Sequence, residues 1–150
     1  MTKIAIFPGS FDPFTRGHLD IVNRATSLFD HIIIGIGFND QKKRMFEVYS
    51  MKEKIEHVFK NTSNISVEVY SSLTADFAQS KNARFLLRGI RNTTDFEYEN
   101  AIAQANKHLN PALETVFLMT TPSLAHISST IARELYRFEK DVSAYVPFML

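Results

Sequence analysis

Short apolar runs rich in β-branched residues alternate along the chain with longer segments in which apolar residues recur at helical spacing. The apolar runs predict five strands, at residues 3–7, 31–37, 65–70, 84–87 and 115–119. Each run is followed by a segment long enough for a helix. This alternation is typical of βαβ units, which place their strands in one parallel sheet.

The helices are expected between and after these strands. Apolar residues from Leu19 to Phe29 recur at helical spacing and predict a helix over residues 17–29. Two pairs have capping-box spacing and predict helix starts near residues 51 and 95: Ser50 with Glu53 and Thr94 with Glu97. A shorter helix is expected at residues 74–80, and a last one from near Ser129.

This order of elements predicts an α/β fold: a Rossmann-like, doubly wound, five-stranded parallel sheet with helices on both faces. The sequence shows no internal repeat and no linker, so residues 1–150 are expected to form a single domain. In such sheets ligands bind beyond the carboxyl ends of the strands. The segments that follow each strand are therefore where functional residues are expected.

Composition narrows the function classes. The 150 residues include 17 basic and 16 acidic side chains and no cysteine, which excludes a disulfide-stapled or disordered protein. A net charge of +1 gives no reason to expect nucleic acid as the main partner. No signal peptide precedes Pro8, and the apolar stretch at residues 32–38 is too short to cross a membrane. A cytoplasmic location is expected.

The segment after the first strand, residues 8–18, carries the most specific pattern. Gly9 permits a tight turn and close approach of a ligand to the backbone. The free N–H groups and positive dipole end of the helix near Gly17 form an anion site, with His18 in its first turn. Phosphate is the expected anion, although a rigid turn with a solvated histidine is the plain structural alternative.

Other enzyme signatures are missing. The sequence has no P-loop, no complete G-x-G-x-x-G motif, no G-x-S-x-G elbow, no H-E-x-x-H helix and no Cys/His cluster. Acyl transfer through a serine and zinc chemistry therefore have no support. Phosphate chemistry remains.

Basic and hydroxyl side chains follow three further strands. One of Lys42, Lys43 and Arg44 is a candidate phosphate ligand beside the first loop. Arg88 and Arg91 flank Gly89 and are suited to clamp phosphates with forked hydrogen bonds. In the following helix Asp95 and Glu97 suit a capping role, whereas Glu99 is placed to face the site and accept hydrogen bonds from a ligand. Ser128, Ser129 and Thr130 at the last helix start offer further phosphate donors, and one of them is expected to be the N-cap.

These blocks together resemble the nucleotidyltransferase superfamily with its T/H-x-G-H motif, here residues Thr15 to His18. Within it the chain is similar to the bacterial phosphopantetheine adenylyltransferase family. The discriminating block runs from Arg88 to Glu99 and combines Arg-Gly-Ile-Arg with Asp-Phe-Glu-Tyr-Glu. The resemblance implies transfer of the adenylyl group of ATP to 4'-phosphopantetheine, giving dephospho-CoA and pyrophosphate in coenzyme A biosynthesis.

The resemblance also implies roles for residues. The catalytic residues would be His18, Lys42 and Arg91. Phosphopantetheine would be bound by Ser10, Lys42, Thr74 and Arg88. ATP would be bound by Ser10, Phe11, His18, Gly89, Ile90, Arg91, Glu99, Leu124, Ala125, His126, Ile127, Ser128, Ser129 and Thr130. Leu124 stands where relatives often carry an aromatic residue, and the chain ends at Leu150 where many relatives continue into a further helix. Family members are magnesium-dependent homohexamers, and inhibition by CoA is expected.

A mechanism without a general base fits these residues. A phosphomonoester has a second pKa of about 6, so at neutral pH its oxygen is already a dianionic nucleophile. We expect in-line attack on the α-phosphorus of ATP, with His18 and Lys42 stabilising the developing charge. Arg91 and the hydroxyls of residues 128–130 would hold the leaving pyrophosphate. Magnesium would be carried by the phosphates of ATP, since the sequence shows no carboxylate cage, and no protein metal ligand is predicted.

Two alternatives are considered. A nicotinate mononucleotide adenylyltransferase would share the first loop and the Ile-Ser-Ser-Thr turn, but that family favours histidine where Thr15 stands and lacks the block from Arg88 to Glu99. A non-catalytic nucleotide-binding module would not need His18, Lys42 and Arg91 together. These functions differ in the acceptor that is adenylylated: phosphopantetheine, nicotinate mononucleotide, or none for a binding module.

Overall fold

The computed structural model describes residues 1–150 and contains a single five-stranded sheet. The strands are β1 (Ile4–Gly9), β2 (His31–Gly37), β3 (Ile65–Tyr70), β4 (Phe85–Ile90) and β5 (Glu114–Met119). The helices are α1 (Arg16–Ala25), α2 (Val48–Val58), α3 (Thr74–Ser80), α4 (Thr93–Leu109), the 3₁₀ helix η1 (Pro122–Leu124) and α5 (Ser129–Arg137). Every strand pair is parallel and the strand order is β3-β2-β1-β4-β5. The predicted α/β fold is confirmed.

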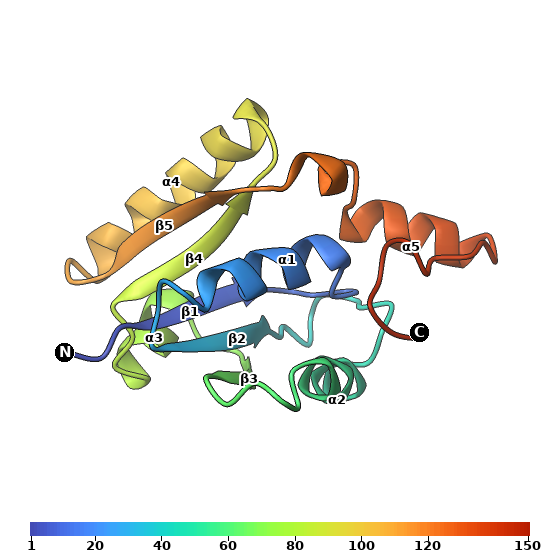
Figure 1. Ribbon diagram of the computed structural model, residues 1–150. Helices are drawn as coiled ribbons and strands as arrows, with labels where there is room; N and C mark the ends of the chain where they lie inside the picture. Colours follow the sequence, from blue (N-terminus) through green and yellow to red (C-terminus); the bar gives the residue numbers. More distant parts are fainter.

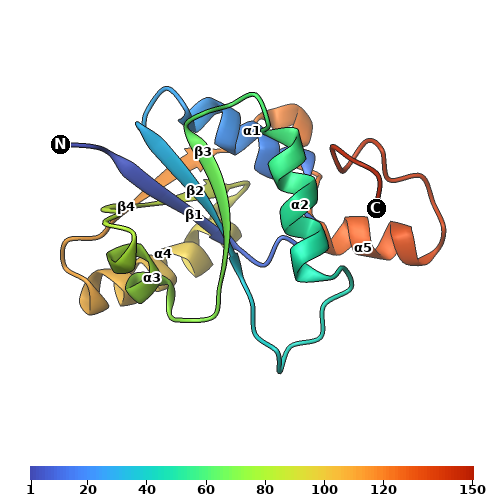
Figure 2. The same cartoon turned by 90° about the horizontal axis from the view of Figure 1, so that it is seen from below.

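The helices cover both faces of the sheet (Figure 1). Because side chains alternate along a strand, Ala5 and Phe7 of β1 point to one face and Ile6 points to the other. On the first face, α1 and α2 contribute Val22 and Ile55 to the larger apolar core. On the opposite face, α3 packs on a smaller core with α4 beside it. Figure 2 shows α1 and α2 on one side of the sheet and α3 and α4 on the other.

Helices α2 and α4 begin earlier than the predicted capping boxes indicate. Glu47 caps α2 by accepting hydrogen bonds from the backbone N–H groups of Tyr49 and Ser50, so this helix begins at Val48. Asn92 caps α4 through the N–H of Asp95. Both predicted capping boxes were therefore wrong, because a side-chain acceptor slightly earlier in each segment already satisfies the free N–H groups.

Further boundaries differ from the prediction. Strand β1 runs to Gly9, so Pro8 and Gly9 belong to the strand and not to the loop after it. Helix α1 ends at Ala25 instead of residue 29, and its last apolar neighbour, Phe29, enters the core from the following turn. Strand β4 runs to Ile90, so Arg88 and Gly89 belong to the strand and not to the loop after it. In this longer strand, Arg88 pairs with Phe117 of β5 and Gly89 pairs with Leu118.

The strand order places a topological switch between β1 and β4. The chain leaves β1 toward β2 on one side, while β4 lies on the other side of β1. The crevice beyond the carboxyl ends of these two strands is where a doubly wound sheet binds ligands. Helix α5 and the C-terminal segment lie beyond this same edge (Figure 1), and Tyr145 O accepts a 2.8 Å hydrogen bond from Arg16 N at the start of α1.

Candidate active site

The first loop ends in a side-chain arrangement that fixes the tautomer of His18. Thr15 is the N-cap of α1, and its hydroxyl accepts from His18 N. In return, the backbone N–H of Thr15 donates to Nδ1 of His18 at 2.9 Å. A backbone N–H can only donate, so Nδ1 carries no proton. In the neutral ring the proton is therefore on Nε2.

Aromatic rings surround the His18 imidazole. The ring centroids of Phe7, Phe11 and Phe14 lie 6.0, 5.0 and 5.4 Å from that of His18. Burial, together with the nearby charges of Arg88 and Arg91, lowers the pKa of His18 from 6.5 to about 3. His18 is thus neutral at physiological pH. It can donate a hydrogen bond from Nε2 to a phosphate oxygen, but it does not bring a full positive charge.

Arg88 and Glu99 form a partly buried ion pair below the first loop. Nε and Nη2 of Arg88 donate to Glu99 Oε2 and Oε1 at 2.7 and 2.5 Å, and Nη1 donates to the backbone carbonyl of Pro8. The Glu99 side chain is only 9% exposed. Both carboxylate oxygens are therefore engaged by Arg88, where the sequence led us to expect Glu99 to accept from a ligand.

Arg91 is oriented by the first turn of α4. Its Nε and its backbone N–H both donate to Asp95 Oδ2 at 3.0 Å. Burial of Asp95 opposes its ionisation, but the hydrogen bonds from Arg91 outweigh this and lower the pKa of Asp95. Arg91 is thus held as a fixed cation next to the site, with Nη1 3.5 Å from the carbonyl of Ile127.

The three hydroxyl residues at the start of α5 make internal hydrogen bonds. Ser128 is the N-cap and accepts from Ile131 N at 3.2 Å, as expected for one of the three. Ser129 donates to Pro13 O at 2.8 Å, and Thr130 accepts from Arg133 at 3.3 Å. These bonds join the start of α5 to the first loop and present the N-terminal end of this helix toward the cavity described next.

A smaller cavity of about 420 Å³ lies at the carboxyl ends of β1 and β4. It brings together most of the predicted nucleotide residues: Ser10, Phe11, His18, Gly89, Arg91, Glu99, Ile127, Ser128, Ser129 and Thr130. Phe7 and Thr120 also line it and were not predicted. Only their positions, Phe7 within β1 and Thr120 directly after β5, could have pointed to them.

Four predicted nucleotide residues do not line this cavity. Ile90 is buried in the sheet, where its carbonyl accepts from Thr120 N. Leu124, Ala125 and His126 belong to the η1 segment, and His126 packs edge-on against Tyr145 with centroids 5.8 Å apart. The structure thus leaves the predicted contacts of this segment with the nucleotide untested.

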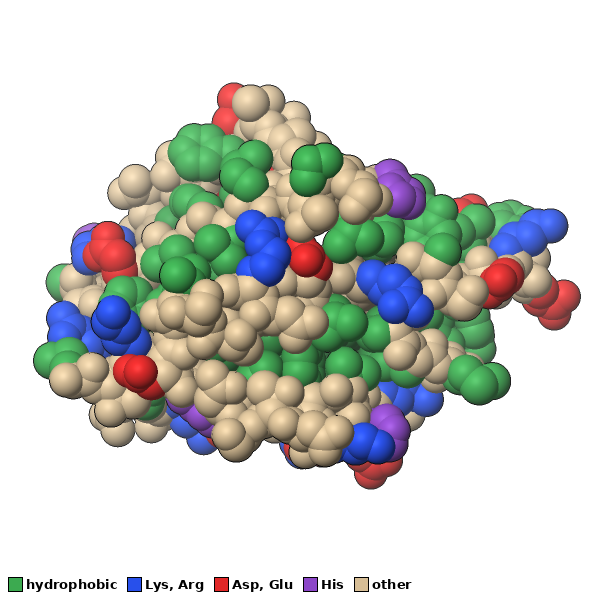
Figure 3. All heavy atoms as spheres, in the orientation of Figure 1, with side chains coloured by type: hydrophobic (Ala, Val, Ile, Leu, Met, Phe, Trp, Pro, Cys, Tyr) green, Lys and Arg blue, Asp and Glu red, His purple; other side chains and the backbone are tan.

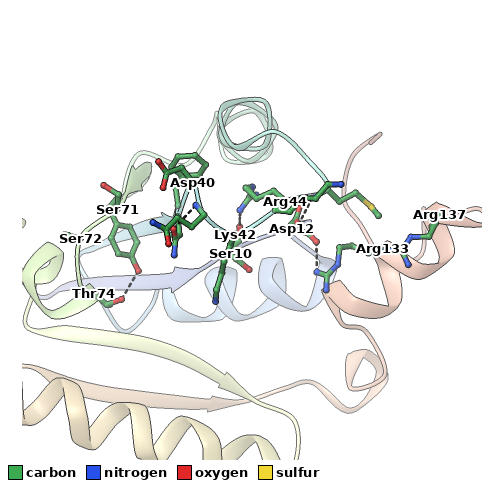
Figure 4. Close-up of a pocket in the computed structure, with 17 residues that line it drawn as sticks. Ser10, Asp12, Asp40, Lys42, Arg44, Ser71, Ser72, Thr74, Arg133 and Arg137 are labelled. Atoms are coloured by element: carbon green, nitrogen blue, oxygen red, sulfur yellow. Dashed lines mark hydrogen bonds and ion pairs between the residues drawn. The ribbon is translucent and has the colours of Figure 1, made fainter.

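A larger cavity of about 1430 Å³ opens beside the smaller one (Figure 4). Ser10, Lys42 and Thr74 line it, as predicted for the acceptor site, and the Thr74 hydroxyl lies 2.8 Å from that of Tyr70. The Lys42 side chain makes no hydrogen bond or ion pair within the chain. Arg88, predicted for the same substrate, lines the smaller cavity instead.

Ser10 is the residue that the two cavities share. Its side chain is exposed, and it follows directly after the last residue of β1. On the molecular face shown in Figure 3, Lys and Arg side chains are scattered and do not form one broad basic patch. Basic side chains line both cavities: Lys42, Lys43, Arg44, Arg133 and Arg137 in the larger one, and Arg88 and Arg91 in the smaller one.

The site offers few groups for a metal. No cluster of three or more His, Cys, Asp or Glu side chains is placed to hold an ion. Two carboxylates of the smaller cavity, Asp95 and Glu99, are paired with arginines. The prediction that magnesium is carried by the nucleotide phosphates therefore stays a prediction.

No helix in the structure has both the length and the apolar character needed to cross a membrane.

Solved structures share this fold. A bifunctional NMN adenylyltransferase/ADP ribose pyrophosphatase from Francisella tularensis has a TM-score of 0.74 and 17% identity, and the match covers 97% of this chain and 45% of that chain. A putative nicotinate-nucleotide adenylyltransferase from Vibrio parahaemolyticus has a TM-score of 0.71 and 20% identity, covering 97% of this chain and 87% of that chain. At such low identity they establish the fold alone.

Sequence comparison establishes the class. Residues 6–135 match the Cytidylyltransferase-like family model, so the fold and site belong to a nucleotidyltransferase. The chain is 56% identical over 150 residues to a phosphopantetheine adenylyltransferase from Cytophaga hutchinsonii, with 100% of both chains covered. It is 49% identical over 143 residues to one from Phocaeicola vulgatus, covering 95% and 94% of the two chains. The chain belongs to the phosphopantetheine adenylyltransferase family.

Proposed function

We propose that this enzyme transfers the adenylyl group of ATP to 4'-phosphopantetheine, producing dephospho-CoA and pyrophosphate. The observation that carries the proposal is full-length identity of 56% to a phosphopantetheine adenylyltransferase. The arrangement of two cavities that meet at Ser10 supports a reaction between two bound substrates. The smaller cavity would hold the phosphates of ATP, and the larger one would hold the acceptor.

The acceptor phosphate needs no general base. Its second pKa is about 6, so its oxygen is mostly deprotonated at neutral pH. His18 is neutral with its proton on Nε2, and its Nδ1 is occupied by Thr15 N. It therefore acts as a hydrogen-bond donor to the α-phosphate and not as a base. Catalysis then consists of positioning the two phosphates and stabilising the charge that develops between them.

The cations have separate tasks in this scheme. Lys42, with no partner in the chain, would bind the acceptor phosphate and bring it toward the α-phosphorus for in-line attack. Arg91, already oriented by Asp95, would hold the departing pyrophosphate together with the N-terminal end of α5. Arg88 would supply positive potential from its pair with Glu99 and support the Pro8 carbonyl. Magnesium bound to the ATP phosphates would neutralise part of their charge.

Three broader properties belong to the same proposal. A homohexamer is supported by exposed apolar side chains on α4 and at the end of β5, among them Tyr98 and Met119 at 68% and 63% exposure. Inhibition by CoA would follow if the product of the later pathway steps occupied the same cavities. A cytoplasmic enzyme would have direct access to ATP.

The nicotinate mononucleotide alternative is not favoured. Structural neighbours named as NMN or nicotinate-nucleotide adenylyltransferases reach only 17% and 20% identity, whereas a phosphopantetheine adenylyltransferase reaches 56% over the whole chain. A non-catalytic module is not favoured either, because His18, Lys42 and Arg91 are all present at the two cavities.

The proposed function is tested by pyrophosphate release from ATP and magnesium. Parallel reactions would contain 4'-phosphopantetheine or nicotinate mononucleotide as the acceptor. We expect release only with phosphopantetheine, and dephospho-CoA as the second product by mass spectrometry. Release only with the mononucleotide would contradict the proposal, and ATP binding without release in either reaction would indicate a binding module.

A further inference from the structure

Four consecutive backbone carbonyls of the first loop each accept a hydrogen bond from a distant side chain. Nη1 and Nη2 of Arg44 donate to Ser10 O and Phe11 O at 2.5 and 3.2 Å. Arg133 of α5 donates to Asp12 O at 2.8 Å. Ser129 donates to Pro13 O at the same distance. Loop 10–13 is therefore held from outside by the 39–46 segment and by α5.

Arg44 is itself fixed at the centre of this arrangement. Its Nε donates to Phe46 O at 2.9 Å, and Asp12 Oδ1 lies 3.9 Å from Nη2. The Asp12 carboxylate also accepts from the backbone N–H groups of Met45 and Phe46 at 2.9 and 2.8 Å. The Arg44 side chain is only 12% exposed. All three of its nitrogens are engaged, so Arg44 is a structural contact and not a free phosphate ligand.

The loop has a conformation that needs such support. Phe11 has a φ of 46°, in the left-handed region that non-glycine residues rarely adopt. A residue held there persists only when the surrounding contacts determine its conformation. The Phe11 ring also covers Gly9, where a Cβ atom would lie 2.9 Å from the ring. The hydrogen bonds from Arg44 to the carbonyls of Ser10 and Phe11 supply such contacts.

Arg44 also lies close in the fold or in the sequence to two residues that are expected to contact substrates, Ser10 and Lys42. Ser10, whose carbonyl accepts from Arg44, lines both cavities. Lys42 precedes Arg44 by two residues and lines the larger cavity. Figure 4 shows Arg44 between Asp12 and the strand end that carries Ser10, with Lys42 on the same side.

We propose that Arg44 is a positioning residue for adenylyl transfer, which fixes Ser10 at the junction of the two cavities and ties the Lys42 loop to it. The proposal rests on the proposed function. It assigns Arg44 a role that acts through other residues, with no contact to the reacting atoms. Arg133 gives the same loop a second point of attachment, through one hydrogen bond to Asp12 O.

The physical consequence is that loss of Arg44 should change kcat more than the KM for ATP. Loss of Arg44 leaves His18 and Arg91 in the smaller cavity but frees the loop that carries Ser10, so the KM for ATP should change less than the KM for phosphopantetheine. A displacement of the reacting groups by about 1 Å costs on the order of 10²-fold in rate. We therefore expect kcat to fall on the order of 10²-fold and the KM for phosphopantetheine to rise, because Ser10 and Lys42 move relative to each other.

The experiment compares Arg44→Lys, Arg44→Ala and Lys43→Ala with the unmodified enzyme. Lysine keeps the charge but has no planar fork that can reach two carbonyls. Positioning therefore predicts that Arg44→Lys stays impaired in kcat. Lys43→Ala removes one charge from the same loop without touching residues 10–13, and it measures the purely electrostatic effect. Full kcat in Arg44→Lys, or equal kcat losses in Arg44→Ala and Lys43→Ala, would overturn the proposal.

A second readout does not depend on the substrate. Amide hydrogen exchange should be faster in the peptide that contains residues 9–14 of Arg44→Lys, with exchange in β2 and β3 unchanged. Arg133→Ala provides a further variant that removes only the Asp12 O contact from the loop, and it should show a smaller effect in the same peptide. Unchanged exchange in this peptide would contradict the proposal. If the unmodified enzyme does not adenylylate phosphopantetheine, the proposed function fails while the exchange result still decides whether Arg44 holds the loop.

Discussion

The two cavities differ in how their charges are held. In the smaller cavity, Arg88 and Arg91 are paired with Glu99 and Asp95, and His18 is neutral among aromatic rings. In the larger cavity Arg44, Arg133 and Arg137 are also engaged within the chain, but the Lys42 side chain has no partner. A paired cation keeps its position before the ligand arrives, whereas a free lysine adapts to it. The smaller cavity is therefore preorganised for charge that develops during the reaction, and the larger one is suited to capture a mobile phosphate.

This comparison predicts its largest effect at His18. Replacement by alanine removes the Nε2 donor of the preorganised cavity and should lower kcat by on the order of 10²- to 10³-fold, as for loss of one charge-stabilising donor. Steady-state pyrophosphate release measures the loss. The matched control is His57→Ala, at an exposed histidine near the end of α2. A near-normal kcat in His18→Ala would show that this cavity does not act through its histidine.

A smaller effect is expected at Lys42. Lys42→Ala removes one charge-assisted contact to the acceptor phosphate, worth about 1.5–3 kcal/mol, or roughly 10- to 100-fold in kcat/KM for phosphopantetheine. The KM for ATP should change much less. Initial rates over a range of both substrate concentrations separate the two constants. Equal changes for both substrates would contradict the assignment of Lys42 to the acceptor cavity.

The smallest effect concerns stability against pH. Because the pKa of His18 is about 3 in the folded protein and about 6.5 when unfolded, the unfolded state binds more protons between these values. The free energy of unfolding contributed by His18 is complete above pH 6.5 and falls as the pH is lowered. From pH 7 to pH 5 the loss is about 2 kcal/mol.

Urea unfolding of the protein and of His18→Gln at pH 7, 6 and 5 checks this prediction. Glutamine does not titrate, so its curve isolates the contribution of other groups such as Asp95, whose lowered pKa gives a loss in the same direction. Parallel curves for the two proteins would mean that His18 is not desolvated in the folded state, and the contrast between the cavities would then disappear.

Several site residues could be predicted because their signals are local. Thr15 and His18 lie three residues apart at a helix start, where a cap and an anion site are both expected. Ser10, Lys42 and Arg91 follow strands, and in a parallel sheet these ends meet at one edge. The order of the elements predicts the edge at which these residues lie, and the family resemblance singled out Ser10 and Lys42 among their neighbours.

Other features could not be predicted, because they depend on contacts between distant segments. The sequence suggested that Glu99 would accept from a ligand, and it gave no sign that both Glu99 oxygens also accept from Arg88, eleven residues earlier. It also grouped Arg44 with two lysines, whereas the structure directs Arg44 to the carbonyls of Ser10 and Phe11. Neither pairing has a periodic signal in the sequence. Which of several like-charged side chains is paired depends on which partner lies near it in the folded chain.

The sequence by itself determined the order of strands and helices, the edge at which phosphate chemistry is expected, and membership of a nucleotidyltransferase family. These follow from hydrophobic periodicity and from short motifs, which act through neighbouring residues. Only the tertiary structure decided which cations are paired, why His18 is neutral, and that Ser10 stands between two cavities. Desolvation and charge pairing depend on what surrounds a group in space, and that is set when the sheet and its helices pack together.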